Sequence, residues 1–294
     1  MMAKVDFASM LRNKMRLTAL ALMVFSSACG DDERVTPVMW TVVAEGAEGA
    51  PPSYLLGTMH LGVSTNDLPQ EVWHAFSSTR TLLVETDLRA IDLEAFRTLA
   101  ALPDGTTLNQ LISSEAWADL LELLPGASPA AVGKLRPWAA RMEVFRVLFP
   151  TPEGMDLTFL QEADQAQMTL TPLETWQAQL APFTQIPLTE DALALETLLS
   201  EQDAIVSATH ELVSVYKAGD WDQVQTKAVA AGAVPAESDP FYDTFIRNRN
   251  QAWLPQLEAS LQNGGAFVAV GFGHLMGSDG LLAQLAEKGF TVSR

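Results

Sequence analysis

The 294-residue sequence contains a single cysteine, Cys29, close to its beginning. One cysteine can form no disulfide bond within the chain, so a fold held together by disulfides is excluded. A chain of this length, with 48% hydrophobic residues, can bury a core that is large enough to be stable without such bonds. We therefore expect an ordinary globular protein with one large domain or two small ones.

Basic residues are also scarce. The sequence has 18 lysines and arginines against 36 aspartates and glutamates, which gives a formal net charge of −18. Proteins that bind nucleic acid need clusters of Lys and Arg, and a negative net charge repels polyanions. Nucleic acid is therefore not expected as a partner, and the excess of acidic residues by itself indicates no other partner.

The apolar stretch near the start, residues 17–25, is too short to span a bilayer, and it follows four basic residues. Residues 1–28 thus have the pattern of a secretory signal peptide. The letters "SSAC", residues 26–29, resemble the lipobox of bacterial lipoproteins, in which the cysteine is lipidated and becomes the mature N-terminus. We expect a lipidated Cys29, a tether over residues 29–37, and an exported lipoprotein anchored to a membrane of the cell envelope or periplasm. The alternative is an ordinary cleaved signal peptide in which the cysteine occurs by chance.

The pattern of apolar residues predicts strands at both ends of the chain and one in its middle. The predicted strands are a hairpin over residues 39–46 and 53–60, then residues 80–88, 167–176, 265–272 and 290–292. Helical periodicity covers residues 69–79 and dominates from about residue 92 to 259. A last helix is expected to begin at Ser278–Asp279 and to end at Gly289. The predicted fold is a single α/β domain, residues 38–294, with a mixed central sheet and a large helical insertion.

One short pattern occurs twice, about 210 residues apart. Both "YLLGTMHLG", residues 54–62, and "AVGFGHLMG", residues 269–277, place an apolar strand before a glycine, two spacers and a histidine. In parallel or mixed sheets, ligands bind at the carboxyl ends of strands, where a glycine allows a sharp turn. If the two strands are neighbours, His60 and His274 lie side by side at that edge of the sheet.

A carboxylate follows another apolar strand. Glu85 ends "LLVE", where a carboxylate is costly to bury without a partner. Two imidazoles and one carboxylate match the ligands of zinc hydrolases and the open-sided triads that hold other divalent metals. The pattern therefore predicts a metal site at His60, Glu85 and His274. The structural alternatives are hydrogen-bonded core or capping histidines, and a turn-capping Glu85, a role that Asp87 fits equally well.

Several other catalytic patterns are missing from the sequence. "HELVS" at His210 lacks the second histidine of a zincin helix, and there is no Gly-x-Ser-x-Gly elbow. His74 and His210 lie in helical patterns without partners at ligand spacing and are expected to be structural. "GFGHLMG" imitates a dinucleotide-binding loop, but it has one spacer too many and only 17 residues follow Gly277.

Seven pieces of the sequence together resemble the TraB/GumN family, which is related to the Tiki metalloproteases. In chain order they are "GTMHLG", "ETDL", "LRPWAA", "EGMDLTFLQEA", "PLETWQAQL", "RNQAW" and "VGFGHLMGSDGLLAQLAEKGFTV". The similarity covers roughly residues 38–294. It implies a protease-like fold that uses a divalent metal, with a peptide or protein as its substrate.

The resemblance also implies site residues. On motif matches, His60, Glu85 and His274 are candidates for the metal site. The other polar and glycine candidates at the cleft are Asp156, Glu174, Arg249, Asn250, Gly57, Gly271 and Gly273. In "IRNRN" the Arg–Asn pair occurs twice, and the later pair is chosen over residues 247–248 because a tryptophan follows it at the family's spacing.

These residue types give a hypothesis for the chemistry. A divalent metal such as Mn, Co or Zn lowers the pKa of a bound water and polarises a carbonyl. Arg249 or Asn250 would stabilise the resulting oxyanion, and Glu174 would act as general base. For Glu174 the alternative is a carboxylate at the start of a helix. The predicted function is a metal-dependent peptidase or hydrolase, and the alternative is a non-catalytic lipoprotein that binds a peptide or other ligand in the same cleft.

The lipid anchor can be tested by replacing the cysteine. Cys29→Ser removes the thiol that would carry the lipid, so the variant should move from the membrane fraction to the soluble exported fraction. Fractionation followed by mass spectrometry of the N-terminus measures this. A wild-type protein that is already soluble and carries no acyl group would contradict the anchor, but it would leave the interpretation of residues 38–294 intact.

Overall fold

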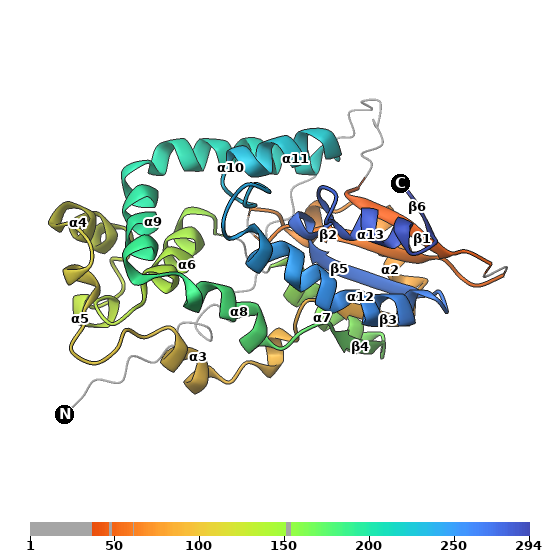
Figure 1. Cartoon of the computed structure of the whole chain (residues 1–294), viewed down its shortest axis with the longest axis horizontal. Helices are drawn as coiled ribbons and strands as arrows, with labels where there is room; N and C mark the ends of the chain where they lie inside the picture. Colours follow the sequence, from red (N-terminus) through yellow and green to blue (C-terminus); the bar gives the residue numbers. More distant parts are fainter. Residues whose placement is uncertain (1–36, 47–48, 61, 151–153) are drawn as a thin grey trace, which may run out of the picture. The chain divides into compact units, whose positions relative to one another are not determined.

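The computed structural model describes residues 37–46, 49–60, 62–150 and 154–294 (Figure 1). The predicted signal peptide, Cys29 and the tether up to residue 36 lie outside the described residues. Within the described ranges, no helix is both long enough and apolar enough to cross a membrane.

A six-stranded mixed sheet forms the centre of the domain (Figure 1). The strands are β1 (Met39–Ala44), β2 (Ser53–Thr58), β3 (Thr81–Val84), β4 (Thr169–Pro172), β5 (Ala266–Gly271) and β6 (Phe290–Ser293). Their order is β4-β3-β5-β2-β1-β6, with β1 antiparallel to both β2 and β6, and with β2, β5, β3 and β4 parallel to one another. The mixed α/β architecture, the β1–β2 hairpin and the strand in the middle of the chain are thereby confirmed.

The central strand β5 is buried along its whole length. Its sequence, "AFVAVG", is continuously apolar, as expected for a parallel strand covered on both faces. On one face the ring of Phe267 packs against Phe76 of α2 (Gln70–Ser77) and Phe159 of α7 (Met155–Gln165), with centroids 5.3 and 5.4 Å apart. Figure 1 shows α12 (Asn248–Leu261) and α13 (Leu281–Glu287) in front of the sheet.

The helical part of the chain consists of two excursions, one on each side of β4. The first contains η2 (Leu88–Ala90), α3 (Leu93–Leu99), η3 (Leu108–Gln110), α4 (Ser114–Leu123), α5 (Pro129–Val132), α6 (Pro137–Leu148) and α7. The second contains α8 (Trp176–Gln185), α9 (Leu188–Ser200), α10 (Gln202–Lys217), α11 (Trp221–Ala230), the π-helix η4 (Asp243–Arg247) and α12. Helices α4, α5, α6 and α9 share a hydrophobic core of their own, so the two excursions fold together.

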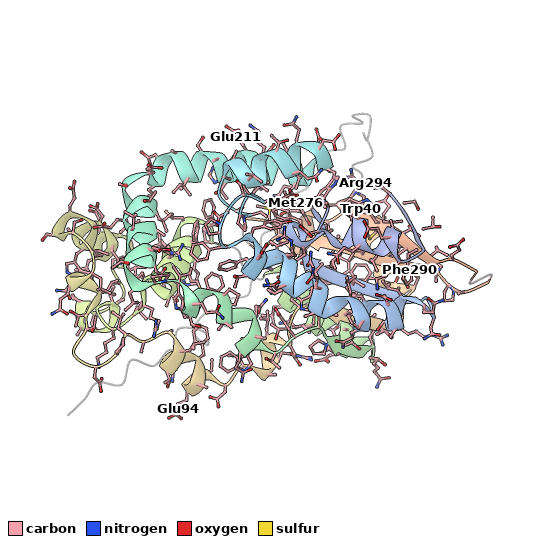
Figure 2. All side chains as sticks on the ribbon, in the orientation of Figure 1. Trp40, Glu94, Glu211, Met276, Phe290 and Arg294 are labelled. Carbon is pink, nitrogen blue, oxygen red and sulfur yellow. The ribbon has the colours of Figure 1, made fainter. Side chains whose placement is uncertain are left out.

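Side chains at the edge of the sheet formed by β1 and β6 tie this part of the sheet to the helices. Figure 2 shows Trp40, Phe290 and Arg294 near one another at this edge. The ring of Trp40 makes an edge-on contact with Trp221 of α11, with centroids 4.9 Å apart, and the guanidinium of Arg294 lies 5.5 Å from the Trp40 ring.

The start of the last helix differs from the prediction. Helix α13 begins at Leu281 after Gly280, and not at Ser278–Asp279. The carboxylate of Asp279 is 2.9 Å from Nε of Arg247, and the backbone carbonyl of Asp279 accepts hydrogen bonds from Asn250 and Gln284. Because these contacts hold Asp279, its side chain does not cap α13. The residues directly after β5 form the 3₁₀ turn η5 (Phe272–Leu275).

A buried carboxylate joins the two helical excursions. Asp191 of α9 is only 1% exposed, accepts the backbone N–H of Trp138 at 2.9 Å and pairs with Nη2 of Arg141 at 2.7 Å. The Trp138 N–H lies in the first turn of α6, where backbone N–H groups lack partners within the helix. Burial raises the pKa of Asp191, and Arg141 opposes this rise.

Removing this carboxylate should destabilise the domain. Asp191→Ala leaves the Trp138 N–H and the Arg141 guanidinium without their acceptor, which should lower the free energy of unfolding by about 1–3 kcal/mol. Urea denaturation followed by circular dichroism measures the change. The control is Glu190→Ala, at the exposed neighbouring position of α9, which should change stability by less than about 0.5 kcal/mol. Equal effects of the two variants would contradict the assigned role of Asp191.

Candidate functional site

Four of the predicted site residues follow the carboxyl ends of four neighbouring parallel strands. His60 follows β2, Glu85 follows β3, Glu174 follows β4, and His274 follows β5. Because these strands run in the same direction, their carboxyl ends meet at one edge of the sheet. The two glycine–histidine motifs lie on strands that are paired directly, with Thr58 opposite Gly271.

Gly271 lies where the predicted metal ligands meet. A Cβ atom at this position would be 3.1 Å from Oε1 of Glu85, 3.3 Å from Nε2 of His60 and 3.8 Å from Cδ2 of His274. The Gly271 N–H donates to Oε1 of Glu85 at 2.7 Å. The absence of a side chain therefore leaves room for the three groups to approach one another.

His60 is oriented by a carboxylate on helix α7. Its Nδ1 lies 2.7 Å from Oδ2 of Asp156, and the hydroxyl of Thr58 donates to Oδ1 of Asp156 at 3.1 Å. Asp156 raises the pKa of His60 to about 9. The His60 side chain is 57% exposed, so we attribute this rise to the charge of Asp156. With a proton held at Nδ1 by Asp156, Nε2 points toward the Gly271 side of the site.

His274 is buried and is oriented by an amide. Its Nδ1 lies 2.7 Å from Oδ1 of Asn250, so Nδ1 carries the proton and Nε2 is the acceptor of the neutral ring. The Asn250 amide group donates to the carbonyls of His274 and Asp279 at 3.1 and 2.8 Å. The ring also packs on Trp253, with centroids 4.4 Å apart. Burial lowers the pKa of His274 to about 3, so the ring is neutral at physiological pH.

Arg249 lies among the candidate ligands and uses all five of its N–H groups. Nη2 donates to Oε2 of Glu85 at 2.7 Å, and Nε and Nη2 both donate to Glu174. Nη1 lies 3.0 Å from Nε2 of His274 and 3.2 Å from the carbonyl of Phe245. This guanidinium is mostly buried, as expected only for a charge that is paired on several sides.

The two carboxylates of the site differ in their environments. Burial alone would raise the pKa of Glu85, but the nearby His274, Arg249 and His60 hold it well below its usual range. Oε2 of Glu85 also accepts a hydrogen bond from Gln179 at 2.9 Å. Burial raises the pKa of Glu174, although Arg249 opposes the rise. Glu85 is therefore the more strongly ionised of the two.

The side chains at this edge of the sheet are of types that bind divalent metals, but two of them, Glu85 and His274, are hydrogen-bonded to Arg249. Asp156 and Asn250 leave Nε2 of His60 and of His274 as the ring atoms available for a ligand, and Gly271 keeps the space beside Glu85 open. The Nε2 lone pair of His274, however, faces Arg249. Over the part of the chain that the structure describes, no group of three His, Cys, Asp or Glu side chains is arranged to hold a metal ion as it stands.

The structure places the other predicted residues as follows. Arg247 pairs with Asp243 and Asp279 away from the site, so the later Arg–Asn pair is the one that reaches it. Gly57 is closely packed, because a Cβ there would come within 2.9 Å of Cβ of Phe272. Gly273 is similar, because a Cβ there would lie 2.8 Å from a methyl group of Val234. Contact of either glycine with a substrate stays a prediction.

Several residues that support the site were not among the predicted ones. Gln179 contacts Glu85, and Thr58 contacts Asp156. The sulfur of Met155 accepts the Met59 N–H at 3.3 Å, and the hydroxyl of Tyr216 donates to the carbonyl of Gly57 at 2.6 Å. Thr58, Met155 and Gln179 lie inside the motifs quoted above, whereas Tyr216 on α10 carries no sequence signal that points to the site.

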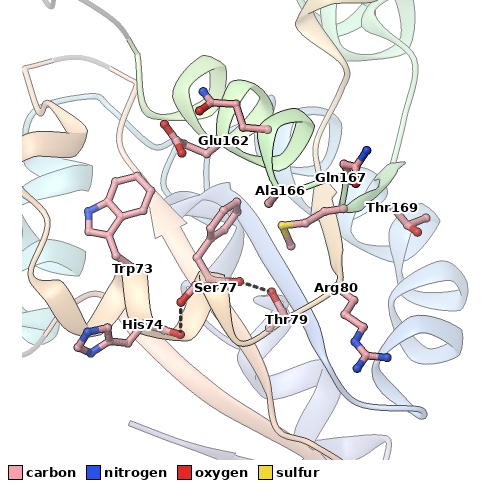
Figure 3. A pocket seen from close by; sticks show the side chains of 12 residues that line it. Trp73, His74, Ser77, Thr79, Arg80, Glu162, Ala166, Gln167 and Thr169 are labelled. Atoms are coloured by element: carbon pink, nitrogen blue, oxygen red, sulfur yellow. Dashed lines mark hydrogen bonds between the residues drawn. The ribbon is translucent and has the colours of Figure 1, made fainter.

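A separate pocket lies at the other end of β3 and β4 (Figure 3). Its volume is about 860 Å³, and Trp73, Phe76, Arg80, Glu162 and Met168 are among the residues that line it. Its wall includes the residues just before β3, whereas Glu85 comes just after that strand. None of the predicted site residues lines this pocket.

Comparisons with known proteins agree with the resemblance. Residues 38–294 match the model of the TraB/PrgY/gumN family. The chain is 26% identical to the uncharacterized protein YbaP of Shigella flexneri, over 84% of this chain and 92% of that protein. It is 22% identical to a protein named metalloprotease TIKI homolog from Amphimedon queenslandica, over 90% of this chain and 63% of that protein. It is 21% identical to metalloprotease TIKI1 of Homo sapiens, over 86% of this chain and 61% of that protein. No solved structure matches the chain.

The pairing of His60 with Asp156 predicts a pH effect. Asp156→Asn removes the charge that favours the imidazolium, so the pKa of His60 should fall from about 9 toward the ordinary value of about 6.5. An NMR titration of the His60 ring measures the shift. Asp164→Asn, on the exposed far end of α7, is the matched control and should leave the His60 pKa unchanged. An unshifted His60 in the Asp156 variant would contradict the pairing.

Proposed function

The chain belongs to the TraB/PrgY/gumN family, and from this premise we propose that it is a divalent-metal-dependent peptidase of the cell envelope. One observation carries the proposal. Two imidazoles, each oriented through Nδ1 by its own polar partner, converge with the ionised Glu85 around Gly271. Such partners are typical of histidines that bind metals.

The relatives support peptidase activity through their names. Several are named metalloproteases, and the chain spans about three fifths of their length. Peptidase activity, substrate and metal are therefore proposed for this chain, with His60, Glu85 and His274 as the residues that would hold the metal. When bound, a divalent cation lowers the pKa of water and polarises a peptide carbonyl.

The other residues then have separate tasks. Asp156 and Asn250 hold the Nδ1 protons of the two imidazoles, so Nε2 is the atom of each ring that would bind a metal, and at His60 the metal would displace the Nε2 proton of the imidazolium. Arg249 would supply the positive charge for an oxyanion after an N–H of Nη1 leaves His274, whereas the Asn250 amide donates to two backbone carbonyls. Glu174 remains the candidate base. Both of its oxygens accept hydrogen bonds from Arg249, so it would act as a base only with one of these bonds released.

That engagement of Glu174 favours a second candidate function. If Glu174 serves only to hold Arg249, the site has charged groups that can bind a ligand but no carboxylate free to act as a base. The protein would then bind a peptide or another ligand at the envelope without turnover. A lipid anchor at Cys29 would fit either function, since it would place the site outside the cytoplasm.

Replacing the histidines tests the proposal. His60→Ala and His274→Ala should each abolish retention of Zn, Mn or Co, because two ligands remain where three are needed. Elemental analysis of the purified protein measures retention. Peptide hydrolysis should also be lost in both variants and in the presence of chelator, and should return in the wild type when metal is added. His74→Ala, an exposed histidine of α2, is the control and should retain both properties.

The outcomes separate the candidates. Metal retention without hydrolysis of any peptide supplied supports the binding protein. A wild-type protein that retains no metal from any of the three salts contradicts both the metal site and the metal-dependent peptidase. Circular dichroism of each variant shows whether a loss comes from the missing ligand or from unfolding.

A further inference from the structure

The lone pair of one imidazole decides whether the site can hold a metal. His274 has two ring nitrogens, and its Nδ1–H donates a hydrogen bond to Oδ1 of Asn250 at 2.7 Å. That leaves Nε2 with a single lone pair, which lies 3.0 Å from Nη1 of Arg249. One lone pair cannot accept this hydrogen bond and bind a metal at the same time.

Arg249 also donates a hydrogen bond to a second candidate metal ligand, Glu85. Its Nη2 is 2.7 Å from Oε2 of Glu85, and the other oxygen of Glu85 accepts the Gly271 N–H. The guanidinium thus already supplies one positive charge to the pair of buried carboxylates Glu85 and Glu174. A divalent cation placed beside it would meet a like charge in a site with little access to water.

We propose that Arg249 is a built-in competitor of the metal, so that a divalent cation binds only when Nη1 leaves His274. This inference rests on the proposed function and concerns the regulation of the same site. The other hydrogen bonds of Arg249 would keep its guanidinium in the site while Nη1 leaves His274. The bonds to Glu85 and Glu174 join opposite charges, whereas the bond to His274 has a neutral acceptor and is the weaker one.

The opposite role for Arg249 predicts the opposite result. If Arg249 only orients Glu85 for the metal, its loss should weaken metal binding. If it competes with the metal, its loss should strengthen binding. The direction of one change in affinity therefore separates a competitor from a supporting residue.

The experiment compares metal affinities of the full-length protein after treatment with chelator. Arg249→Met keeps an apolar stem near Trp253, which lies 4.8 Å from the guanidinium carbon, but it removes the charge and all five donors. Titration with zinc chloride in a calorimeter should give a Kd at least about tenfold lower than that of the wild type, as expected for the loss of a competing hydrogen bond from a charged group. Arg247→Met removes the same charge two residues earlier in the chain, outside the site, and should leave the Kd unchanged.

A second measurement does not depend on the variant folding. In wild-type protein labelled with ¹⁵N, zinc should shift Nε2 of His274 and change the signal of the Arg249 guanidinium, because the bond between them is lost. The Nδ1 proton of His274 should remain, because Asn250 still accepts it. Metal binding that leaves the guanidinium signal unchanged would overturn the competition.

The failures are distinguishable. A higher or equal Kd in Arg249→Met overturns the competitor role and leaves the proposed metal site standing. If neither the wild type nor the folded Arg249→Met variant binds zinc, manganese or cobalt, the proposed metal site fails and the competition fails with it. Tighter binding in Arg249→Met, with Arg247→Met unchanged, supports the proposal.

Discussion

The candidate site depends on buried ion pairs between one guanidinium and two carboxylates. Arg249 joins helix α12 to Glu85 at the end of β3 and to Glu174 at the end of β4. The two strands are paired here as well, because the Glu174 N–H donates to the Glu85 carbonyl at 2.9 Å. No member of the trio can be removed without leaving a poorly solvated charge, so they fix where α12 meets the sheet.

The imidazoles are held from opposite sides of this trio. Asp156 approaches His60 from α7, and Asn250 approaches His274 from α12. The helices on the two faces of the sheet thus each supply one orienting group, while the strands supply the rings. His60 is exposed and His274 is buried, so a molecule from solvent would reach the His60 side first.

Much of the fold was predictable because its signals are local. The apolar strands, the doubled glycine–histidine pattern and Glu85 can each be recognised within a few residues, and β2 and β5 proved to be neighbours. The resemblance supplied Arg249, which no local pattern distinguishes from Arg247. Gln179 and Tyr216 could not be predicted as supports of the site, since their contacts join segments far apart in the chain. The predicted start of α13 was wrong because Arg247 and Asn250 hold Asp279.

The strand order has a consequence for when the sheet can assemble. β5 lies between β2 and β3, although it is the fifth strand to be synthesised. Until it is present, the β1–β2 hairpin and the β3–β4 pair are separate two-stranded pieces, which are marginally stable in water. The chain therefore cannot complete its core from the N-terminal end onward. Such late closure delays the folding of the sheet until nearly all of the chain has been made.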